Sequence, residues 1–526
     1  MKQVVYYIYM DFKNKTTEIL CNGELNTING FRVCDVINMS VNTICFVNNV
    51  KLFSKIYPGG EQPEREYRRK NNTDILTYKY GKCEVRSFSA LFGMTQISNL
   101  LKMFNGCTVT QAMEKYITSF GEPKDVKCTL ALQAQKQFYA PIGEELWEER
   151  KDVGKFYWDK QTYDDMMVGT KAGLLSHVRS VYFENVLMFD KRSAYPSVMV
   201  NDNKFPIGHI ICVDNGSPKM KIKKLKQLLK EDVWCKVVVD ERLEGFPRWY
   251  DSDAKKSGFE YWNLKLIINL GEFENFVNEL MQHDFRLYRS SMTDYLSFIF
   301  RKRVVEVYNE KEKEQKGTIQ RHLKKTMIDM LYGKGIQKND FTEIWQHQRD
   351  MRRKRNLCYM VPEFSNHCIA RVEYEMFKAI KHNEACYYDT DGVKVKNKKE
   401  AFEYFENENK NIMKANKDAG FDTNIGTWDF EGNAEKFLVF SPKVYVFEKD
   451  GKIEAKTAGL CEEFRELQLN NIQGDKFEFL RTHGIKIASP TYIYKDGDVE
   501  VIYPFDKINV MKGDLNGNQI VLPKQV

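Results

Sequence analysis

Two acidic residues in the last third of the chain could take part in metal-dependent chemistry. Asp389 and Asp391 lie two apart in Tyr-Tyr-Asp-Thr-Asp-Gly (387–392), where the pattern predicts a strand, an Asp-Gly turn and a second strand. Residues two apart in a strand share one face, and two neighbouring carboxylates favour a bound cation. Asp-x-Asp-Gly is also ordinary turn chemistry, so this motif alone does not decide between the two interpretations.

A third acidic residue, Asp190, follows the apolar run VLMF (186–189), which predicts a buried strand that ends at the carboxylate. The sequence KRSAYPS comes next, and Pro196 is typical of a turn. Taken alone, Asp190 could simply end a strand.

Three basic residues have helical spacing within the long helical pattern of 296–332, which we expect to form two helices broken near Gly317. Lys313, Arg321 and Lys325 fall in one predicted row, which suits the phosphates of a nucleoside triphosphate. A solvated basic helix face is the alternative.

In this order, the three segments resemble motifs A, B and C of the family B DNA polymerases. They read DKRSAYP (190–196), KTMIDMLYG (325–333) and YYDTD (387–391). More narrowly, the chain resembles the protein-primed branch, the replicases of small bacteriophages and linear plasmids. SPKVY (441–445) matches its Lys-x-Tyr element and KTAG (456–459) its Lys-x-Ala-Gly segment, so the resemblance covers about residues 165–470.

The resemblance implies an α+β multidomain fold, a right-hand polymerase with palm, fingers and thumb and an N-terminal RNase H-like remnant of an exonuclease. The expected parts are an exonuclease-like domain (1–130), the palm with motif A (131–201), an insertion resembling the region that contacts the terminal protein (202–299), the fingers (300–336), a second insertion (337–359), the rest of the palm (360–460) and the thumb (461–526).

The resemblance also implies two-metal phosphoryl transfer, with Mg²⁺ as the cofactor and Mn²⁺ able to substitute. Asp190 and Asp391 are the expected bridging ligands, Asp389 assists, and the backbone carbonyl of Lys191 completes a site. The remaining expected contacts are to nucleotide and DNA: Lys325, Lys313, Arg321 and Ser193 with the triphosphate, Tyr195 under the sugar, Tyr332 at the new base pair, Lys443 and Tyr445 at the primer end, and Gly173 at the template strand.

Several positions depart from the family's motifs. Motif B has Asp329-Met330 in place of Asn-Ser, Gly392 follows motif C where Ser is common, and TKAG (170–173) stands for Tyr-x-Gly-Gly. In the N-terminal region, Lys13 and Phe53 occupy positions where the exonuclease motifs carry acidic ligands, and no Tyr-x-x-x-Asp occurs between 100 and 170. We therefore expect no 3′–5′ proofreading.

Composition agrees with a nucleic-acid partner. The chain of 526 residues has 80 Lys and Arg against 73 Asp and Glu, a net charge of +7, and its basic residues cluster at 68–70, 219–226 and 351–355. Its 12 Cys never form C-x-x-C, which argues against a zinc site and a disulfide framework. The cysteines are therefore expected to be reduced thiols in a cytoplasmic compartment, the host cytoplasm if the protein is viral. No apolar run is long enough to span a membrane.

The expected partners are a DNA primer-template, deoxynucleoside triphosphates and a priming protein, with no membrane. Two other functions remain open. The altered motif B is compatible with a nucleotidyltransferase that needs no template, and a non-catalytic DNA-binding or assembly protein could keep the polymerase shape. Retention of Asp190, Asp391 and Lys325 favours the polymerase over the second of these.

Overall fold

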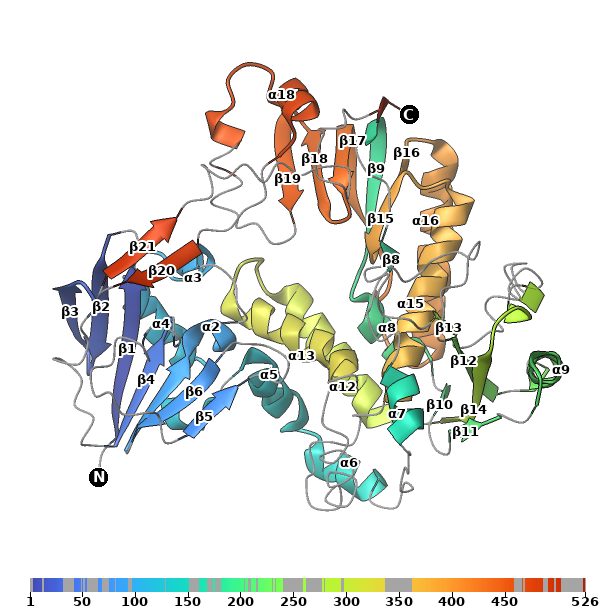
Figure 1. Cartoon of the computed structure of the whole chain (residues 1–526), viewed down its shortest axis with the longest axis horizontal. Coiled ribbons are helices and arrows are strands. Elements are labelled where there is room, and N and C mark those ends of the chain that lie inside the picture. Colours follow the sequence, from blue (N-terminus) through green and yellow to red (C-terminus); the bar gives the residue numbers. More distant parts are fainter. Residues whose placement is uncertain are drawn as a thin grey trace. The chain divides into compact units, whose positions relative to one another are not determined.

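The computed structural model describes the chain in two compact units (Figure 1). The first comprises Met1–Ala140, Glu310–Met330 and Ala488–Ile508, and the second Pro141–Asn309, Leu331–Ile487 and Asn509–Val526. The description omits residues 1–2, 12–13, 32–41, 49, 51–52, 54–64, 69–74, 81, 93–96, 128, 151–159, 168–173, 176–180, 203, 207–209, 214–215, 229, 232, 240–258, 262–276, 279, 295–297, 336–361, 458–465, 467–468, 486–490, 496–497, 503–523 and 526.

The first unit contains a seven-stranded sheet in the order β3-β2-β1-β4-β7-β6-β5. An antiparallel meander, β3-β2-β1, is followed by β4 and β7, which run parallel to β1. This is the RNase H-like topology expected for the N-terminal region. The strands are β1 (Val4–Asp11), β2 (Thr16–Cys21), β3 (Glu24–Asn29), β4 (Thr43–Val47), β5 (Arg65–Arg68), β6 (Ile75–Tyr80) and β7 (Cys83–Ser87).

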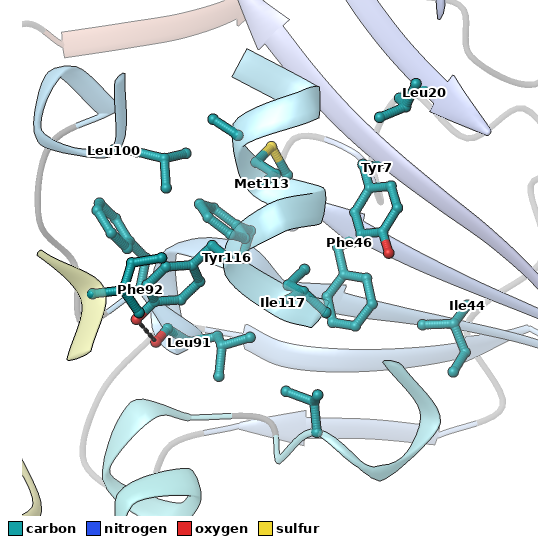
Figure 2. Close-up of a cluster of buried hydrophobic side chains, with 14 residues drawn as sticks. Tyr7, Leu20, Ile44, Phe46, Leu91, Phe92, Leu100, Met113, Tyr116 and Ile117 are labelled. Atoms are coloured by element: carbon teal, nitrogen blue, oxygen red, sulfur yellow. Dashed lines mark hydrogen bonds between the residues drawn. The ribbon is translucent and has the colours of Figure 1, made fainter. Parts of the chain in front are cut away.

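Short helices cover one face of this sheet. They are α2 (Phe88–Leu91), α3 (Ile97–Met103), α4 (Val109–Thr118), η2 (Pro123–Asp125) and α5 (Leu130–Tyr139). Thr108 and Gln111 form a capping box that begins α4. Figure 2 shows the core between α4 and the strands, where Tyr116 packs near Phe92 and Ile117 near Phe46.

The helical pattern of 296–332 breaks where the sequence predicts. α12 (Phe298–Lys313) ends before Gly317, whose φ of 89° suits glycine, and α13 (Ile319–Gly335) begins after it. Ile319 of α13 joins the core of the first unit. The predicted single row of three basic residues is wrong, because Lys313 is the last residue of α12 and only Arg321 and Lys325 share α13.

The second unit is built on an eight-stranded sheet in the order β19-β18-β17-β9-β16-β15-β8, with β22 beside β9. The predicted strand before Asp190 and the predicted hairpin around motif C are present as β9 and β15-β16. The strands are β8 (Leu174–Leu175), β9 (Val181–Lys191), β15 (Tyr387–Thr390), β16 (Gly392–Lys396), β17 (Trp428–Ser441), β18 (Val444–Lys449), β19 (Lys452–Thr457) and β22 (Lys524–Gln525).

Helices pack around this sheet, and α15 contacts both α8 and β16 (Figure 1). The helices of the second unit, besides α12 and the end of α13, are α6 (Gly143–Arg150), α7 (Lys160–Met167), α8 (Ala194–Asn201), α9 (Pro218–Leu228), α15 (Pro362–His382), α16 (Lys399–Asp418) and α18 (Lys476–His483). None of the described helices combines the length and the hydropathy needed to cross a membrane.

The predicted insertion 202–299 forms a sheet of its own, in the order β10-β14-β12-β13 with β11 beside β14. Its strands are β10 (Lys204–Pro206), β11 (Ile211–Cys212), β12 (Val233–Val239), β13 (Phe259–Tyr261) and β14 (Phe285–Asp294). The second predicted insertion, 337–359, lies outside the described residues. The predicted thumb range, 461–526, is divided between the units, since the hairpin β20 (Thr491–Lys495) and β21 (Asp498–Ile502) belongs to the first.

Candidate active site

Asp190 and Asp391 come together at one end of the large sheet. Asp190 lies near the end of β9, directly opposite Gly392 of the antiparallel strand β16. The backbone N–H of Lys191 donates to the carbonyl of Asp391 at 2.8 Å. Asp190 at the end of β9 and Asp391 in the turn between β15 and β16, which are far apart in the sequence, are therefore held close together by backbone hydrogen bonds.

The turn that carries Asp391 is strained. Asp389 pairs with Gly392, so Thr390 and Asp391 form a two-residue turn, and Thr390 has a φ of 58°. A β-branched residue rarely takes this left-handed conformation, which costs about 1–3 kcal/mol. Ser193, just after motif A, has a φ of 48°. Strained backbone of this kind is typical of functional sites.

Gly392 is explained by close packing. A Cβ at this position would lie 2.9 Å from Nζ of Lys394 and 3.1 Å from Oδ1 of Asp190. Lys394 is only 5% exposed, and its ammonium lies 3.8 Å from the carboxylate of Glu431. The serine common in the family after motif C would crowd both the buried ammonium and the carboxylate, so glycine accommodates Lys394.

Asp389 is held by a residue of the Lys-x-Tyr element. The ammonium of Lys443 lies 3.4 Å from Oδ1 of Asp389 and donates to the hydroxyl of Thr390 at 3.3 Å. The N–H of Lys443 donates to the hydroxyl of Tyr387 at 2.8 Å. The ring of Tyr445 packs 5.2 Å from that of Tyr387, and burial, with the nearby charge of Asp389, raises the pKa of Tyr445.

A buried ionic network supports the residue after Asp190. The ammonium of Lys191 forms an ion pair with Glu375 of α15 at 2.6 Å, and Arg371 contacts Asp202 at 3.3 Å. Burial opposes ionisation of Glu375, but the charges of Lys191 and Arg371 outweigh it and lower the pKa of Glu375. His367 also contacts Asp202, at 3.0 Å. Motif A is thereby fastened to α15.

Tyr195 and Tyr332, both expected near the nucleotide, stack on each other with ring centroids 4.1 Å apart. Tyr195 is 6% exposed, and its hydroxyl has no hydrogen-bond partner within the described part of the chain. Burial, followed by the neighbouring Tyr332, Glu373 and Asp391, raises the pKa of Tyr195. The pair therefore places Tyr195 within electrostatic reach of one carboxylate of the site.

The basic residues of motif B lie in the first unit, whereas the three carboxylates lie in the second. Lys325 is exposed on α13. Arg321 is already engaged, because its guanidinium donates to the carbonyls of Lys311 at 2.6 Å and Glu314 at 3.0 Å. Arg321 thus satisfies the C-terminal carbonyls of α12, while Lys313 at that end is exposed.

Sequence reasoning missed several residues at this site. Asp429 of β17 lies directly opposite Asp190, and its carboxylate pairs with Arg192. Lys394 and Glu375 were also missed. Only Glu375 carries a signal in the sequence, because it is a charged residue within ARVEYEMFKAIKH (370–382), an amphipathic pattern that predicts a helix.

Of the residues expected at a remnant exonuclease site, the structure describes Asp11 and Phe53. The carboxylate of Asp11 accepts hydrogen bonds from N and Nδ2 of Asn14, at 3.1 and 2.8 Å. Phe53 is fully buried in the sheet core. Lys13, like Gly173 of the predicted template contact, lies outside the described residues.

The donor set of the large sheet is compatible with Mg²⁺. Among the described residues, no three His, Cys, Asp or Glu side chains converge on one point as a metal site. Asp190, at the end of β9, and Asp391, in the turn before β16, nevertheless offer hard oxygen ligands from neighbouring segments. Mg²⁺ commonly binds one or two carboxylates together with substrate phosphates and water, so this pair fits such an ion.

Comparisons with known proteins show the fold. No protein-family model and no curated protein matches the sequence. Phi29 DNA polymerase complexed with primer-template DNA matches with a TM-score of 0.65 at 12% identity, over 95% of this chain and 99% of that one. The same polymerase with single-stranded DNA gives 0.62 at 11% identity, with the same coverage. A family B DNA polymerase from Pyrobaculum calidifontis gives 0.40 at 11% identity, over 91% of this chain and 64% of that one. The expected polymerase fold is therefore confirmed: the chain has the fold of phi29 DNA polymerase.

Proposed function

We propose that the chain is a DNA-directed DNA polymerase that adds deoxynucleotides to the 3′ end of a primer. The observation that carries this proposal is the pairing of strands β9 and β16, which brings Asp190 of motif A beside Asp391 of motif C. Phi29 DNA polymerase, whose fold the chain shares, has been solved with primer-template DNA and incoming nucleotides.

In this proposal Asp190 and Asp391 hold Mg²⁺, with Mn²⁺ able to replace it, and the backbone carbonyl of Lys191 adds a ligand. Two such ions supply charge stabilisation for both the attacking and the leaving oxygen of a phosphoryl transfer. The protein's own part is to fix the carboxylates, which the backbone bond from Lys191 to Asp391 and the Lys191–Glu375 ion pair both do.

The incoming nucleotide would be held by residues of motifs A and B. Tyr195 would pack under the sugar, its stacked partner Tyr332 would line the base-pair pocket, and Ser193 would offer its hydroxyl to the triphosphate. Lys325 would neutralise charge at the α-phosphate. Lys313 is exposed and would contact the outer phosphates. Arg321 would affect them indirectly, because its hydrogen bond to the carbonyl of Lys311 holds the turn between α12 and α13.

The primer end would be held by Lys443 and Tyr445, and the template strand by the segment around Gly173. Lys443 extends from its ion pair with Asp389, so a primer phosphate would compete with that carboxylate for the ammonium. We further propose that priming uses a protein hydroxyl, that the sheet within 202–299 contacts the priming protein, and that the N-terminal domain is an exonuclease fold without proofreading activity.

Primer extension tests the polymerase proposal. With Mg²⁺ and a templated end, wild type should extend the primer according to template, whereas Asp190→Asn and Asp391→Asn should lose extension by at least about a thousandfold while remaining folded. Asp422→Asn, the same change at an exposed carboxylate, is the matched control and should extend normally. Near wild-type extension by Asp391→Asn would show that the site is assigned wrongly.

The altered motif B keeps a second function open. Asp329 replaces an uncharged residue of the family, and its charge acts on the buried Lys311 within the first unit. A template-independent nucleotidyltransferase would extend single-stranded and templated ends equally, without regard to template sequence. A non-catalytic DNA-binding protein would bind primer-template and extend neither.

A further inference from the structure

A cavity of about 530 Å³ lies in the first unit, lined by residues of the β6–β7 hairpin, of residues 124–127 and of α5. Its lining includes five cationic and only two acidic side chains, so the cavity is strongly positive. The charged residues are Lys79, Arg86, Lys124, Lys127, Lys136, Glu84 and Asp125.

Arg86 forms the fixed part of this cavity. Its guanidinium pairs with Glu84 at 2.8 Å and donates to the carbonyls of Pro123 at 3.1 Å and Val126 at 2.9 Å. The charge of Arg86 is therefore compensated, and its hydrogen bonds fasten residues 123–126 to the sheet. Those bonds hold Lys124 and Lys127 in place at the cavity.

The four lysines supply the uncompensated charge. All four are exposed, and among the described residues no carboxylate lies within ion-pair distance of Lys79, Lys124 or Lys127. Lys136 donates to the backbone carbonyl of Asp125 at 3.3 Å, so its charge is not cancelled either. Four ammonium groups around one hollow repel one another, and an anion with several charged oxygens would relieve that repulsion.

We propose that this cavity binds the phosphate groups of single-stranded DNA. Several ammonium groups spread over one hollow suit successive phosphates of a strand. The one aromatic residue of the lining, Tyr78, is 4% exposed and belongs to the sheet core, so no ring is free to stack on a base. Binding should therefore be independent of sequence. DNA binding by the cavity does not require nucleotide addition, because all the lining residues are far in the sequence from the catalytic motifs and lie in the first unit.

Lysine acylation of the full-length wild-type protein tests the cavity directly. An oligothymidylate added without nucleotides should reduce acylation of Lys124, Lys127 and Lys136 several-fold, as read by peptide mass spectrometry. Lys410 and Lys417, exposed on α16, serve as internal controls and should be acylated equally with and without DNA. Unchanged acylation of the cavity lysines would overturn the proposal. Protection by pyrophosphate but not by the oligothymidylate would overturn it as well.

Charge reversal gives an independent measurement. The double variant Lys124→Glu, Lys127→Glu should bind the oligothymidylate more weakly, and the log–log salt slope should become shallower by about 1.4, since each lost phosphate contact on a single strand changes it by about 0.7. The double variant Lys410→Glu, Lys417→Glu makes the same charge change and should bind as wild type does. Equal affinity and slope in the two double variants would overturn the proposal.

Primer extension by the same preparations separates this proposal from the polymerase proposal. Suppose that wild type extends no primer and that the cavity variant binds the oligothymidylate more weakly than wild type. This result would contradict the polymerase proposal alone. A cavity variant that extends a short-overhang primer and binds the oligothymidylate like wild type would contradict the cavity alone.

Discussion

At the scale of single residues, the unexpected feature is a buried cation beside the carboxylates. The sequence GVKVK (392–396) alternates, so it predicts Lys394 and Lys396 on one solvated face. Lys396 is exposed, but Lys394 is buried, because β16 is an internal strand between β9 and β15. Burial of an ammonium group is costly unless it is paired. The ammonium of Lys394 pairs with Glu431, and both that ammonium and Oδ1 of Asp190 border the space where a Cβ of residue 392 would stand, so Lys394 places a positive charge near Asp190.

This arrangement predicts the effect of removing the charge of Lys394. In Lys394→Met, the carboxylates of Asp190 and Glu431 lose a nearby cation, so we expect a lower melting temperature without metal and a larger rise on adding Mg²⁺ than in wild type. Differential scanning fluorimetry over a Mg²⁺ titration measures both. Lys396→Met, two residues along the same strand, is the control and should behave as wild type. An equal Mg²⁺ response in the two variants would show that Lys394 does not act on the carboxylates.

Two substitutions of Tyr195 separate its ring from its hydroxyl. The hydroxyl is buried and has no hydrogen-bond partner among the described residues, so Tyr195→Phe should keep or slightly raise the stability and should still exclude ribonucleotides. Tyr195→Ala removes the ring that stacks on Tyr332, so it should cost about 3–5 kcal/mol and admit ribonucleotides.

The measurements for Tyr195 are urea denaturation and competitive incorporation of ribonucleotides against deoxynucleotides. Unchanged sugar selection in Tyr195→Ala, at a temperature where it is folded, would mean that the tyrosine is only a core aromatic.

At the scale of elements, the sequence predicts where helices and strands end better than it predicts the contacts between the elements on either side. The break near Gly317 and the hairpin of motif C were both predicted, since glycine and Asp-Gly mark them locally. The prediction that Lys313, Arg321 and Lys325 lie in one row was wrong. Helical spacing does not continue across the turn between α12, which ends at Lys313, and α13, so Lys313 does not share a helix face with the other two. The contact of Arg321 with the carbonyls of α12 has no sequence signal, since it depends on how the two helices turn.

This difference in role predicts opposite phenotypes for Arg321 and Lys325. Arg321→Met leaves the carbonyls of Lys311 and Glu314 without their charged donor, so we expect a loss of about 1–3 kcal/mol in the free energy of unfolding. Lys325→Met removes an exposed side chain, so it should keep the stability and instead lower the rate of nucleotide addition. Chemical denaturation and single-turnover extension measure the two effects. A stable but inactive Arg321→Met would place its guanidinium on the triphosphate instead.

At the scale of the whole molecule, the order of motifs was enough to predict the polymerase fold, which the match to phi29 DNA polymerase confirms despite 12% identity. The resemblance to motifs A and C predicts that Asp190 and Asp391 act together, but no residue pattern predicts that β9 pairs with β16. The supporting charges could not be predicted either: Asp429 and Glu375 come from other segments that only the folded sheet and α15 bring near, and the burial of Lys394 depends on the strands beside β16. The positive cavity of the first unit likewise joins short segments with no shared motif.

The last prediction concerns the N-terminal domain, for which the sequence predicts an exonuclease fold without the acidic residues that proofreading needs. Two-metal hydrolysis needs several carboxylates to activate a water. Asp11 is tied to Asn14, Phe53 is sealed in the core, and Lys13 stands where the family motif has a glutamate. A lysine ammonium can supply positive charge, but it cannot lower the pKa of a bound water as a metal does.

We therefore expect no shortening of an end-labelled single strand, or of a mismatched primer end, with Mg²⁺ or Mn²⁺ under conditions where the same preparation extends a matched primer. Asp11→Ala is the control for trace nucleases, because any activity from a contaminant would persist in that variant. Shortening that is present in wild type and disappears in Asp11→Ala would show instead that the domain hydrolyses DNA with ligands other than those at positions 13 and 53. In that case the cavity beside Arg86 would become a candidate path for the strand that approaches Asp11.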